Sequence, residues 1–481
     1  MKKRNQFFGI AAAVILLLCA CADETPAQDG ITTAGAETTP VTEEAPKYEL
    51  PDTDWAGESF AMLVGEGYNE CFVEEETGDA LDDAKYQMKR TVEEALNVTI
   101  SETPTDFWGM PKTVSQYIMA GEDTYDSIAM MDRFALQSAM ENNFIPIQDI
   151  ETINTDAIWW GGELSEKLSI GGNRYFAIGS QNLESFGKTA CILWNTRLAA
   201  SLDLEIPYED VFAGTWTLED FCSYRQTATA DLNGDGVYDH NDQYTYASGD
   251  IRGIPSQFWQ ASDMNIITKD ANDMPQITIW DDQKFLGLLE TLHGLMYTGD
   301  NNVSKINAEE SASNDPAFLE GRVMIYTSVF SSINTAREMN DDFAVLPIPK
   351  YDEAQASYYS RTYDATFFMV PVTQENTALS GAVLDALSCV GYYDLLPVYI
   401  DTVLKEKASR DENSKRSIQI CFDTRTLDMG EAFMFDYFGD QAIYDNVMKK
   451  NDMNLSSYLE KNRKRIDKQL QKIVDTFTDI G

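Results

Sequence analysis

The chain has 481 residues, of which 43% are hydrophobic and 11% aromatic. This length exceeds what one hydrophobic core usually supports, so two domains of ordinary size are expected. With 79 acidic against 36 basic residues, the net charge is -43, which argues against binding to nucleic acid or to an anionic lipid surface. This composition is typical of a soluble protein that faces the outside of a cell.

The N-terminus predicts export and lipid attachment. Three of the first four residues are basic, and residues 7–20 form an apolar run that is too short for a bilayer span of about 20 residues. Residues 1–20 are therefore a predicted signal peptide. The run ends in Leu-Cys-Ala-Cys, which resembles a bacterial lipobox, so Cys21 is the predicted lipidation site. An ordinary cleaved signal peptide that contains cysteines is the alternative, and no later segment is expected to approach transmembrane length.

Residues 21–47 are rich in Thr, Ala, Glu and Pro and contain few large apolar side chains. Burial of so little apolar surface cannot offset the entropy lost on folding, so we expect a disordered tether and a folded body from residue 48. The body has five scattered cysteines without metal-ligand spacing, for which buried free thiols are favoured over one or two disulfides. They are Cys71, Cys191, Cys222, Cys389 and Cys421.

The first third of the body alternates strand and helix patterns. Strands are predicted at 59–64, 97–100 and 126–131, and helices from about 80 and over 113–120. Strands that alternate with helices imply a parallel sheet.

Further predicted strands follow along the chain, together with helices over 218–228 and 282–297. The region from about 376 to the C-terminus is expected to be mainly helical, with a basic, solvated face at 461–472. These later strands are predicted at 174–179, 189–194, 321–326, 343–347 and 366–371.

One local motif, residues 231–242, has the spacing of an EF-hand calcium loop, with Gly236 at its sixth position. A hard cation needs six to eight oxygen ligands, and the glycine permits the sharp turn. A single loop of this kind favours a structural calcium clip over a sensor, and an acidic turn without a cation is the alternative. The predicted ligands are Asp231, Asn233, Asp235, the carbonyl of Val237, Asp239 and Asp242.

The sequence gives little evidence of a catalytic site. The two histidines are His240, inside the acidic loop, and His293, on a predicted helix, so histidine-dependent nucleophilic catalysis lacks a free base. A glycosidase needs only a pair of carboxylates, and the sequence offers dozens without singling out two. We therefore expect a protein that is not an enzyme.

Several segments, taken in order, make the body similar to the family 1 extracellular solute-binding proteins of ABC importers, particularly large lipoproteins of Gram-positive anaerobes. Trp194 departs from the tyrosine that is usual in that family, and some relatives carry a calcium loop at the place of 231–242. The segments that carry the resemblance are 74–79, 121–127, 159–160, 168–177, 193–198, 214–221, 318–322 and 346–351.

The resemblance implies an α/β, periplasmic-binding-protein-like fold of type 2, with two α/β lobes around a ligand cleft joined by crossing strands. Lobe 1 would comprise residues 48–185 and 346–390. Lobe 2 would comprise residues 186–345 and 391–481, including the calcium loop. We place the crossings near residues 179–188 and 345–350, with ligand bound as the lobes close.

Cleft residues are expected where strands end, and aromatic side chains are expected to face sugar rings. For any one tryptophan, packing in the core is the alternative. The candidates are Asp132, Arg133, Phe134, Asn182, Glu184, Tyr326, Phe330, Arg361 and Tyr363 at strand ends and crossings, and the tryptophans Trp108, Trp159, Trp160 and Trp259.

The resemblance implies a lipid-anchored substrate-binding component of an ABC importer, on the extracellular face of the cytoplasmic membrane. It would bind a carbohydrate or oligosaccharide, act with a permease, contact the membrane only through its lipid, and be a monomer. Peptides and other polar nutrients stay open as ligands. A cell-surface glycan-active enzyme and an adhesive lipoprotein are the alternative functions.

Overall fold

The computed structural model describes residues 48–280, 282–306, 315–405, 411–449 and 454–479. All of them belong to one compact unit, Lys47–Gly481. The predicted signal peptide, the lipidation site Cys21 and the tether at 21–47 lie outside the described residues.

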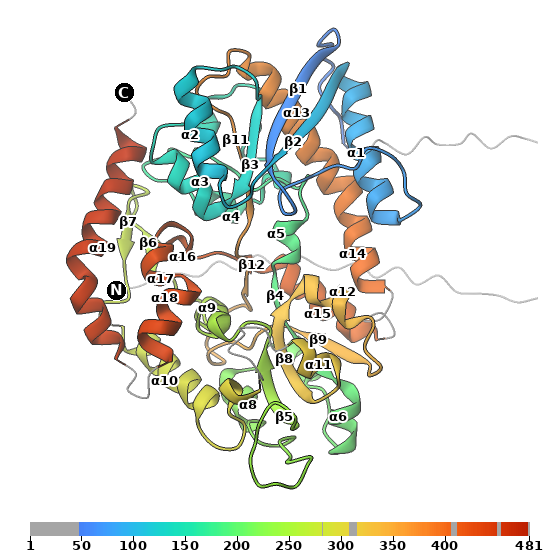
Figure 1. Cartoon of the computed structure of the whole chain (residues 1–481), viewed down its shortest axis with the longest axis vertical. Coiled ribbons are helices and arrows are strands. Elements are labelled where there is room, and N and C mark those ends of the chain that lie inside the picture. Colours follow the sequence, from blue (N-terminus) through green and yellow to red (C-terminus); the bar gives the residue numbers. More distant parts are fainter. Residues whose placement is uncertain (1–47, 281, 307–314, 406–410, 450–453, 480–481) are drawn as a thin grey trace, which may run out of the picture. The chain divides into compact units, whose positions relative to one another are not determined.

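The first sheet has four strands in the order β11-β3-β1-β2. β1 pairs in parallel with β2 and β3, whereas β11 pairs with β3 in the antiparallel direction. The predicted strands and the parallel pairing expected for the first three are confirmed. The antiparallel strand β11 joins them from a distant part of the chain (Figure 1). The strands are β1 (Glu58–Gly65), β2 (Val98–Thr105), β3 (Ser127–Met131) and β11 (Thr366–Met369).

Helix α1 (Ala80–Leu96) begins at Asp79, whose side chain accepts hydrogen bonds from two backbone amides of the first turn. It ends at Asn97, which has a left-handed backbone conformation with φ of 50°. The helix buries Met88 and Val92 and packs against α13 (Thr377–Val390). Two further helices of this region are α2 (Met110–Ala120) and α3 (Asp132–Ala139), and α3 follows β3 directly.

The second sheet has the order β5-β8-β4-β9. β4 pairs antiparallel with β8 and β9, and β5 pairs in parallel with β8. Three of its four strands were predicted, and β5 was not. The strands are β4 (Ala190–Asn195), β5 (Tyr244–Ser248), β8 (Val323–Val329) and β9 (Phe343–Leu346).

Two sequence predictions in this region are wrong. Residues 174–179 form no strand, because only Ala177 makes a bridge, to Phe368, while the amide of Ile178 donates to the Ser165 hydroxyl. The run of apolar residues at 175–178, all of them buried, is what resembles a strand in the sequence. The helix predicted over 218–228 is the shorter α8 (Leu218–Ser223), and downstream the amide of Ala228 donates to the side chain of Thr245.

Four short strands lie outside the two four-stranded sheets. β10 (Ser360–Arg361) pairs in parallel with β12 (Arg425–Thr426), and Thr189 bridges Thr362. β6 (Ile267–Lys269) and β7 (Pro275–Ile277) form a separate hairpin. The first sheet draws its strands from residues 58–131 and 366–369, and the second from 190–346. The exact lobe boundaries stay a prediction.

The mainly helical C-terminal region is confirmed (Figure 1). Its helix α15 packs against β9 and β4, and α16 packs against α3, so helices from the end of the chain contact residues near both sheets. After α13, the helices are α14 (Leu396–Lys405), α15 (Glu412–Asp423), α16 (Met429–Phe433), α17 (Phe435–Phe438), α18 (Asp440–Ile443) and α19 (Leu455–Thr478). Elsewhere, α4 (Glu163–Glu166), α5 (Glu184–Gly187), α6 (Thr196–Ser201), α7 (Tyr208–Ala213), α9 (Ile254–Ala261), α10 (Gln283–Tyr297), α11 (Asp315–Leu319) and α12 (Phe330–Ala336) complete the set of described α-helices.

The continuous helix Thr377–Thr402 is long and apolar enough to span a bilayer by length and composition, contrary to the expectation from the sequence. However, 61% of its apolar window is buried inside the protein. Val383 and Leu387 belong to the hydrophobic core that also contains Phe60 and Val92. The apolar character of the helix is therefore explained by its place in the core.

The five cysteines of the body are free thiols, as favoured from the sequence. Four are buried, and Cys222 is partly exposed. Burial raises the pKa of the Cys222 thiol to about 11 and that of Cys421 to about 12, so both are held in the unreactive protonated form.

Candidate functional site

A cavity of about 280 Å³, called the central cavity here, lies among the ends of strands from both sheets. It receives residues that follow β3 and β5, residues of β10 and the segment after it, and residues of the helices α16 to α18. Its lining residues are Trp108, Asp132, Arg133, Asp250, Arg252, Arg361, Thr362, Tyr363, Asp364, Leu427, Asp428, Glu431, Ala432, Phe435, Asp440 and Gln441.

A buried ion-pair network forms one wall of the central cavity. Arg361 is 2% exposed, and its Nε donates to Glu431 Oε2 at 2.9 Å while its Nη2 bonds to the other oxygen of Glu431 and donates to Asp440 Oδ2 at 2.9 Å. Burial raises the pKa of Glu431, and the Arg361 guanidinium opposes that shift. The guanidinium also lies 4.1 Å from the centre of the Tyr363 ring. These contacts fix the orientation of Tyr363 at the cavity wall.

A second arginine is paired on the side of β5. The Nε and Nη2 groups of Arg252 donate to the two carboxylate oxygens of Asp250, at 2.9 and 2.6 Å, and its Nη1 donates to Gln441 at 2.9 Å. Bidentate pairs of this kind have a fixed geometry. This arginine is therefore held in place by its partners.

The third arginine faces two carboxylates. Arg133 Nη1 lies 4.0 Å from Asp364 Oδ1, and the Arg133 amide donates to the Asp132 side chain at 2.6 Å. Burial, followed by the charge of Asp364, raises the pKa of Asp132 to about 7. Burial likewise raises the pKa of Asp364, although Arg133 opposes this. Asp132, Asp364 and Arg133 thus form a titratable part of the cavity wall, called the acidic corner here.

A side pocket of about 60 Å³ adjoins the central cavity and shares three wall residues with it, Trp108, Arg133 and Asp364. Three of its eight lining residues are aromatic: the Tyr68 and Phe107 rings stack with centres 4.2 Å apart, and the Trp108 ring meets Phe107 edge-on. Trp108 is 66% exposed, so it presents a large aromatic surface to solvent. The full lining is Tyr68, Asn69, Phe107, Trp108, Met131, Arg133, Glu184 and Asp364.

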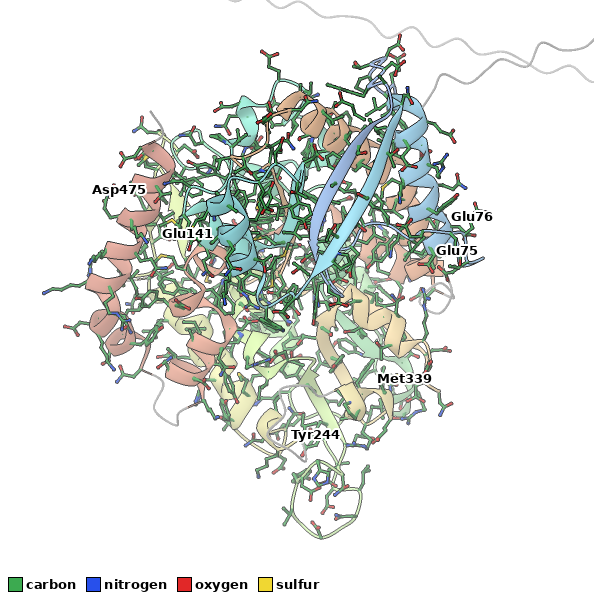
Figure 2. The ribbon with its side chains drawn as sticks, turned by 45° about the horizontal axis from the view of Figure 1, so that its top comes forward. Glu75, Glu76, Glu141, Tyr244, Met339 and Asp475 are labelled. Carbon is green, nitrogen blue, oxygen red and sulfur yellow. The ribbon has the colours of Figure 1, made fainter. Side chains whose placement is uncertain are left out.

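A larger groove of about 1000 Å³, called the α19 groove here, runs between α3, the α16–α17 region and α19. Arg133, Ala432 and Phe435 belong to both the groove and the central cavity, so the two spaces share a wall. Glu141 and Asp475, labelled in Figure 2, also line the groove. The linings of the three hollows are together polar and partly aromatic.

Comparison with solved structures shows which fold this is. An ABC substrate-binding protein from Listeria monocytogenes in complex with cycloalternan matches with a TM-score of 0.56 and 12% identity, over 86% of this chain and 99% of that chain. This chain has the fold of the ABC solute-binding proteins.

Other solute-binding proteins match over similar lengths. The maltotriose-binding protein of Thermus thermophilus has a TM-score of 0.52 and 13% identity, covering 88% of this chain and 100% of that chain. UgpB from Mycobacterium tuberculosis, in complex with glycerophosphocholine, has a TM-score of 0.53 and 12% identity, covering 87% and 98%. Neither a protein-family model nor a curated protein sequence matches this chain. The two-lobed α/β fold expected from the sequence is thereby confirmed.

In this solute-binding fold, seven of the candidate residues surround the three hollows. Phe134 lines the α19 groove and Glu184 lines the side pocket. The five candidates that line the central cavity are Trp108, Asp132, Arg133, Arg361 and Tyr363.

The other six candidates do not line these three hollows. Tyr326 lies within β8, not at its end, and stacks on Phe318, while Phe330 is 2% exposed. Trp159 and Trp160 both donate their indole N–H to Asp385. Core packing, the alternative weighed for each tryptophan, describes Trp160 and Trp259.

Asn182 is also buried, and its side chain forms hydrogen bonds with backbone groups. Its Nδ2 donates to the carbonyl of Glu70 at 3.1 Å, and its Oδ1 accepts from the amide of Glu184 at 2.9 Å. Asn182 therefore positions α5, whose first residue, Glu184, lines the side pocket.

Of the cavity residues from position 250 onward, the sequence predicted only Arg361 and Tyr363. Asp250 and Arg252 follow β5, and the rule that strand ends carry site residues would have found them had β5 been predicted. Glu431, Phe435 and Asp440 lie on helices of five residues or fewer. Helices this short show too little periodicity in a sequence to be recognised, so their position beside a strand end could not be predicted.

The loop at 231–242 projects next to Tyr244, the first residue of β5 (Figure 2). Gly236 has φ of 80°, the left-handed conformation that the sixth position of an EF-hand loop requires. The side chains of the loop accept hydrogen bonds from its own amides, as Asp231 does from Gly236 at 2.8 Å and Asp242 from Asp239 at 2.8 Å.

The donor types and the turn suit a hard cation, but the carboxylates are not gathered around one point. Across the described ranges, no group of three or more Asp, Glu, His or Cys side chains is arranged to hold a metal ion. Calcium binding by Asp231, Asn233, Asp235, Val237, Asp239 and Asp242 therefore stays a prediction.

Proposed function

We propose that this protein is the substrate-binding component of an ABC importer and that it binds a carbohydrate or oligosaccharide in the central cavity. The observation that carries the proposal is the cavity itself: paired arginines, carboxylates and aromatic rings line a hollow among strand ends, in a solute-binding fold. Guanidinium and carboxylate groups can bind sugar hydroxyls, while aromatic faces pack against the C–H surface of a sugar ring.

The lining residues come from segments far apart in the chain. Arg133 follows a strand of the first sheet, Arg252 follows a strand of the second, and Arg361 lies in the short strand β10, which pairs with β12. A ligand that contacts all three would hold the two sheets in one arrangement, so ligand binding by lobe closure is part of the proposal.

Two of the matched proteins support a saccharide as ligand, since their structures contain cycloalternan and maltotriose. The α19 groove, with a volume of about 1000 Å³ and a wall shared with the central cavity, favours an oligosaccharide over a single sugar. The matched structures are of binding proteins, so we propose that the ligand is held and released without chemical change.

The same proposal includes the cellular setting. Lipid attachment at Cys21 would hold the body at the extracellular face of the cytoplasmic membrane, where a permease of the importer would receive the ligand from a monomeric binding protein. A structural Ca2+ in loop 231–242 would stiffen the turn that leads into β5.

A thermal-shift screen with saccharides, peptides and polyols tests the function. A saturable rise in melting temperature with one saccharide class, and the same saccharide recovered intact by chromatography, is the expected result. Consumption of the saccharide would replace the proposal with a glycan-active enzyme, and the absence of any shift with saccharides would contradict it.

A further inference from the structure

The central cavity has more acidic than basic side chains. It contains three guanidinium groups, and the side pocket adds the carboxylate of Glu184. The carboxylates of the central cavity are Asp132, Asp250, Asp364, Asp428, Glu431 and Asp440.

Two of the three arginines are already neutralised. Arg361 binds Glu431 and Asp440, and Arg252 binds Asp250 through both carboxylate oxygens. Both guanidinium groups are thereby engaged by protein carboxylates, which disfavours a ligand that is an anion. Asp428 accepts from the amides of Ile266 and Gly430 and serves as a helix cap.

Among the residues that line the two hollows, Arg133 is the one guanidinium left for the remaining acidic groups. From outside these linings, the charge of Lys188 acts on Asp364 and Glu184, and that of Lys85 acts on Glu184. Arg133 lies 4.0 Å from Asp364, and it lies next to Asp132 in the chain. Burial raises the pKa of Asp132, Asp364 and Glu184, which means that the ionised carboxylates lack part of the solvation that water would give them. A cation brought by the ligand would supply that missing stabilisation.

The excess carboxylates lie beside the aromatic rings of the side pocket. They also lie beside a buried amide oxygen, Asn69 Oδ1, that has no hydrogen-bond partner in the part of the chain that the structure describes. Tyr68 and Trp108 are 46% and 66% exposed at the side pocket, where they can pack against an apolar or cationic group. Asn69 also lines this pocket and is 2% exposed. Its Nδ2 donates to Thr366 Oγ1 at 3.0 Å, but its Oδ1 has no hydrogen-bond partner among the described residues.

We propose that the ligand carries an ammonium group, as an amino sugar or an oligomer of amino sugars does. Asp132, Asp364 and Glu184 receive this group where the central cavity meets the side pocket, whose shared walls include Trp108 and Asp364. The inference rests on the proposed function, because it names the class of saccharide that the same site selects.

The test compares saccharides that differ in one substituent. Isothermal titration of the body Lys47–Gly481, which is one compact unit, would use glucosamine oligomers and cello-oligosaccharides of equal length, together with glucosamine, galactosamine and their neutral parent sugars. Within a pair, the aminated member is expected to bind at least about tenfold more tightly, because it gains a charge-assisted hydrogen bond.

Variants connect the preference to the acidic corner. Asp364→Asn is expected to reduce the preference for the aminated member to about threefold or less, and Glu184→Gln to reduce it as well. Glu75→Gln removes the same charge from an exposed side chain on the loop before α1 and is expected to leave the preference unchanged (Figure 2). Melting temperatures of all variants check that each one folds.

Three outcomes decide the matter. A preference for the aminated sugar that Asp364→Asn removes supports the inference. Equal or tighter binding of the neutral parent overturns it and leaves the proposed function in place. If none of these sugars binds, the inference fails, and the wider saccharide screen then decides the proposed function separately.

Discussion

The guanidinium carbon of Arg133 lies 4.3 Å from the centre of the Phe435 ring. Arg133 is in the first turn of α3, directly after β3, and Phe435 is the first residue of α17. Both residues line the central cavity and the α19 groove, so this cation–π contact is part of the wall between the two spaces. It also connects α3, the helix that directly follows a strand of the first sheet, to the C-terminal helices.

Loss of this wall should weaken ligand binding. Phe435→Ala removes a ring that lines both hollows and leaves the Arg133 side chain without this support, so we expect affinity for the bound saccharide to fall. A loss of about 0.5–2 kcal/mol of binding free energy corresponds to a fall of about two- to thirtyfold. Phe435→Leu is the matched variant, because it keeps apolar volume but lacks the ring, and it should lose nearly as much. Titration calorimetry measures both. Unchanged affinity in Phe435→Ala would show that the wall does not contact the ligand.

Substitution of two tryptophans should affect different quantities, ligand affinity in one case and stability in the other. Trp108 is 66% exposed, so Trp108→Ala should leave the free energy of unfolding within about 0.5 kcal/mol of the parent while lowering saccharide affinity. Trp259 is fully buried against Phe285, and Trp259→Ala should reduce the free energy of unfolding by about 3–5 kcal/mol. Urea denaturation and titration calorimetry measure the two quantities. Full saccharide affinity in Trp108→Ala would remove this residue from the site.

The acidic corner predicts how stability depends on pH. Burial and Asp364 raise the pKa of Asp132 from 3.8 to about 7 in the folded state, with Arg133 opposing; Arg361, Lys188 and Asp440 also act on Asp364. Between these two pH values the folded state keeps a proton that the unfolded chain has released. The free energy of unfolding contributed by Asp132 therefore falls as pH rises from about 4 to about 7, by up to about 1.4 kcal/mol per pH unit.

Asp132→Asn should remove this contribution and flatten the profile over the same range. Glu75→Gln is the control, since this exposed side chain should leave the profile unchanged. Denaturant unfolding from about pH 4.5 to pH 8 provides the data. A profile of the Asp132→Asn variant that matches the parent would contradict the buried titration.

Calcium should act on stability and not on the ligand site. Binding of Ca2+ to the folded loop alone raises the melting temperature, so removal of the ion with EDTA should lower it while saccharide affinity stays unchanged. Asp235→Ala removes one predicted ligand and should abolish the difference between the two conditions. Equal melting temperatures with and without calcium in the parent chain would refute the site.

The sequence predicted elements well where periodicity was long or burial complete. α1 repeats apolar residues over 17 positions, and β1 and β3 are apolar runs bounded by turns. The segment 174–179 was mistaken for a strand because an extended, buried loop has the same apolar pattern. Direction could not be predicted either, since the antiparallel pairing of β11 depends on contacts between residues more than 230 positions apart in the chain.

In the candidate site too, residues beside strongly patterned elements were predicted, and residues placed by distant contacts were not. Asp132 and Arg133 were found because they follow a strongly patterned strand, and Arg361 and Tyr363 because they lie near a predicted crossing. The partners that decide their charge, Glu431 and Asp440, come from short helices some 70 residues further along. No local pattern in the sequence connects such residues, because only the packing of α16 to α18 brings them to the cavity.

The central claim is that the cavity binds a saccharide without altering it. The most direct test is titration calorimetry of the body Lys47–Gly481 with the saccharide that gives the largest thermal shift, followed by chromatography of the mixture. The account predicts saturable one-to-one binding, a weaker affinity in Trp108→Ala, and intact saccharide after incubation. Saccharide that is cleaved, or binding that Trp108→Ala and Phe435→Ala leave at full strength, would contradict it.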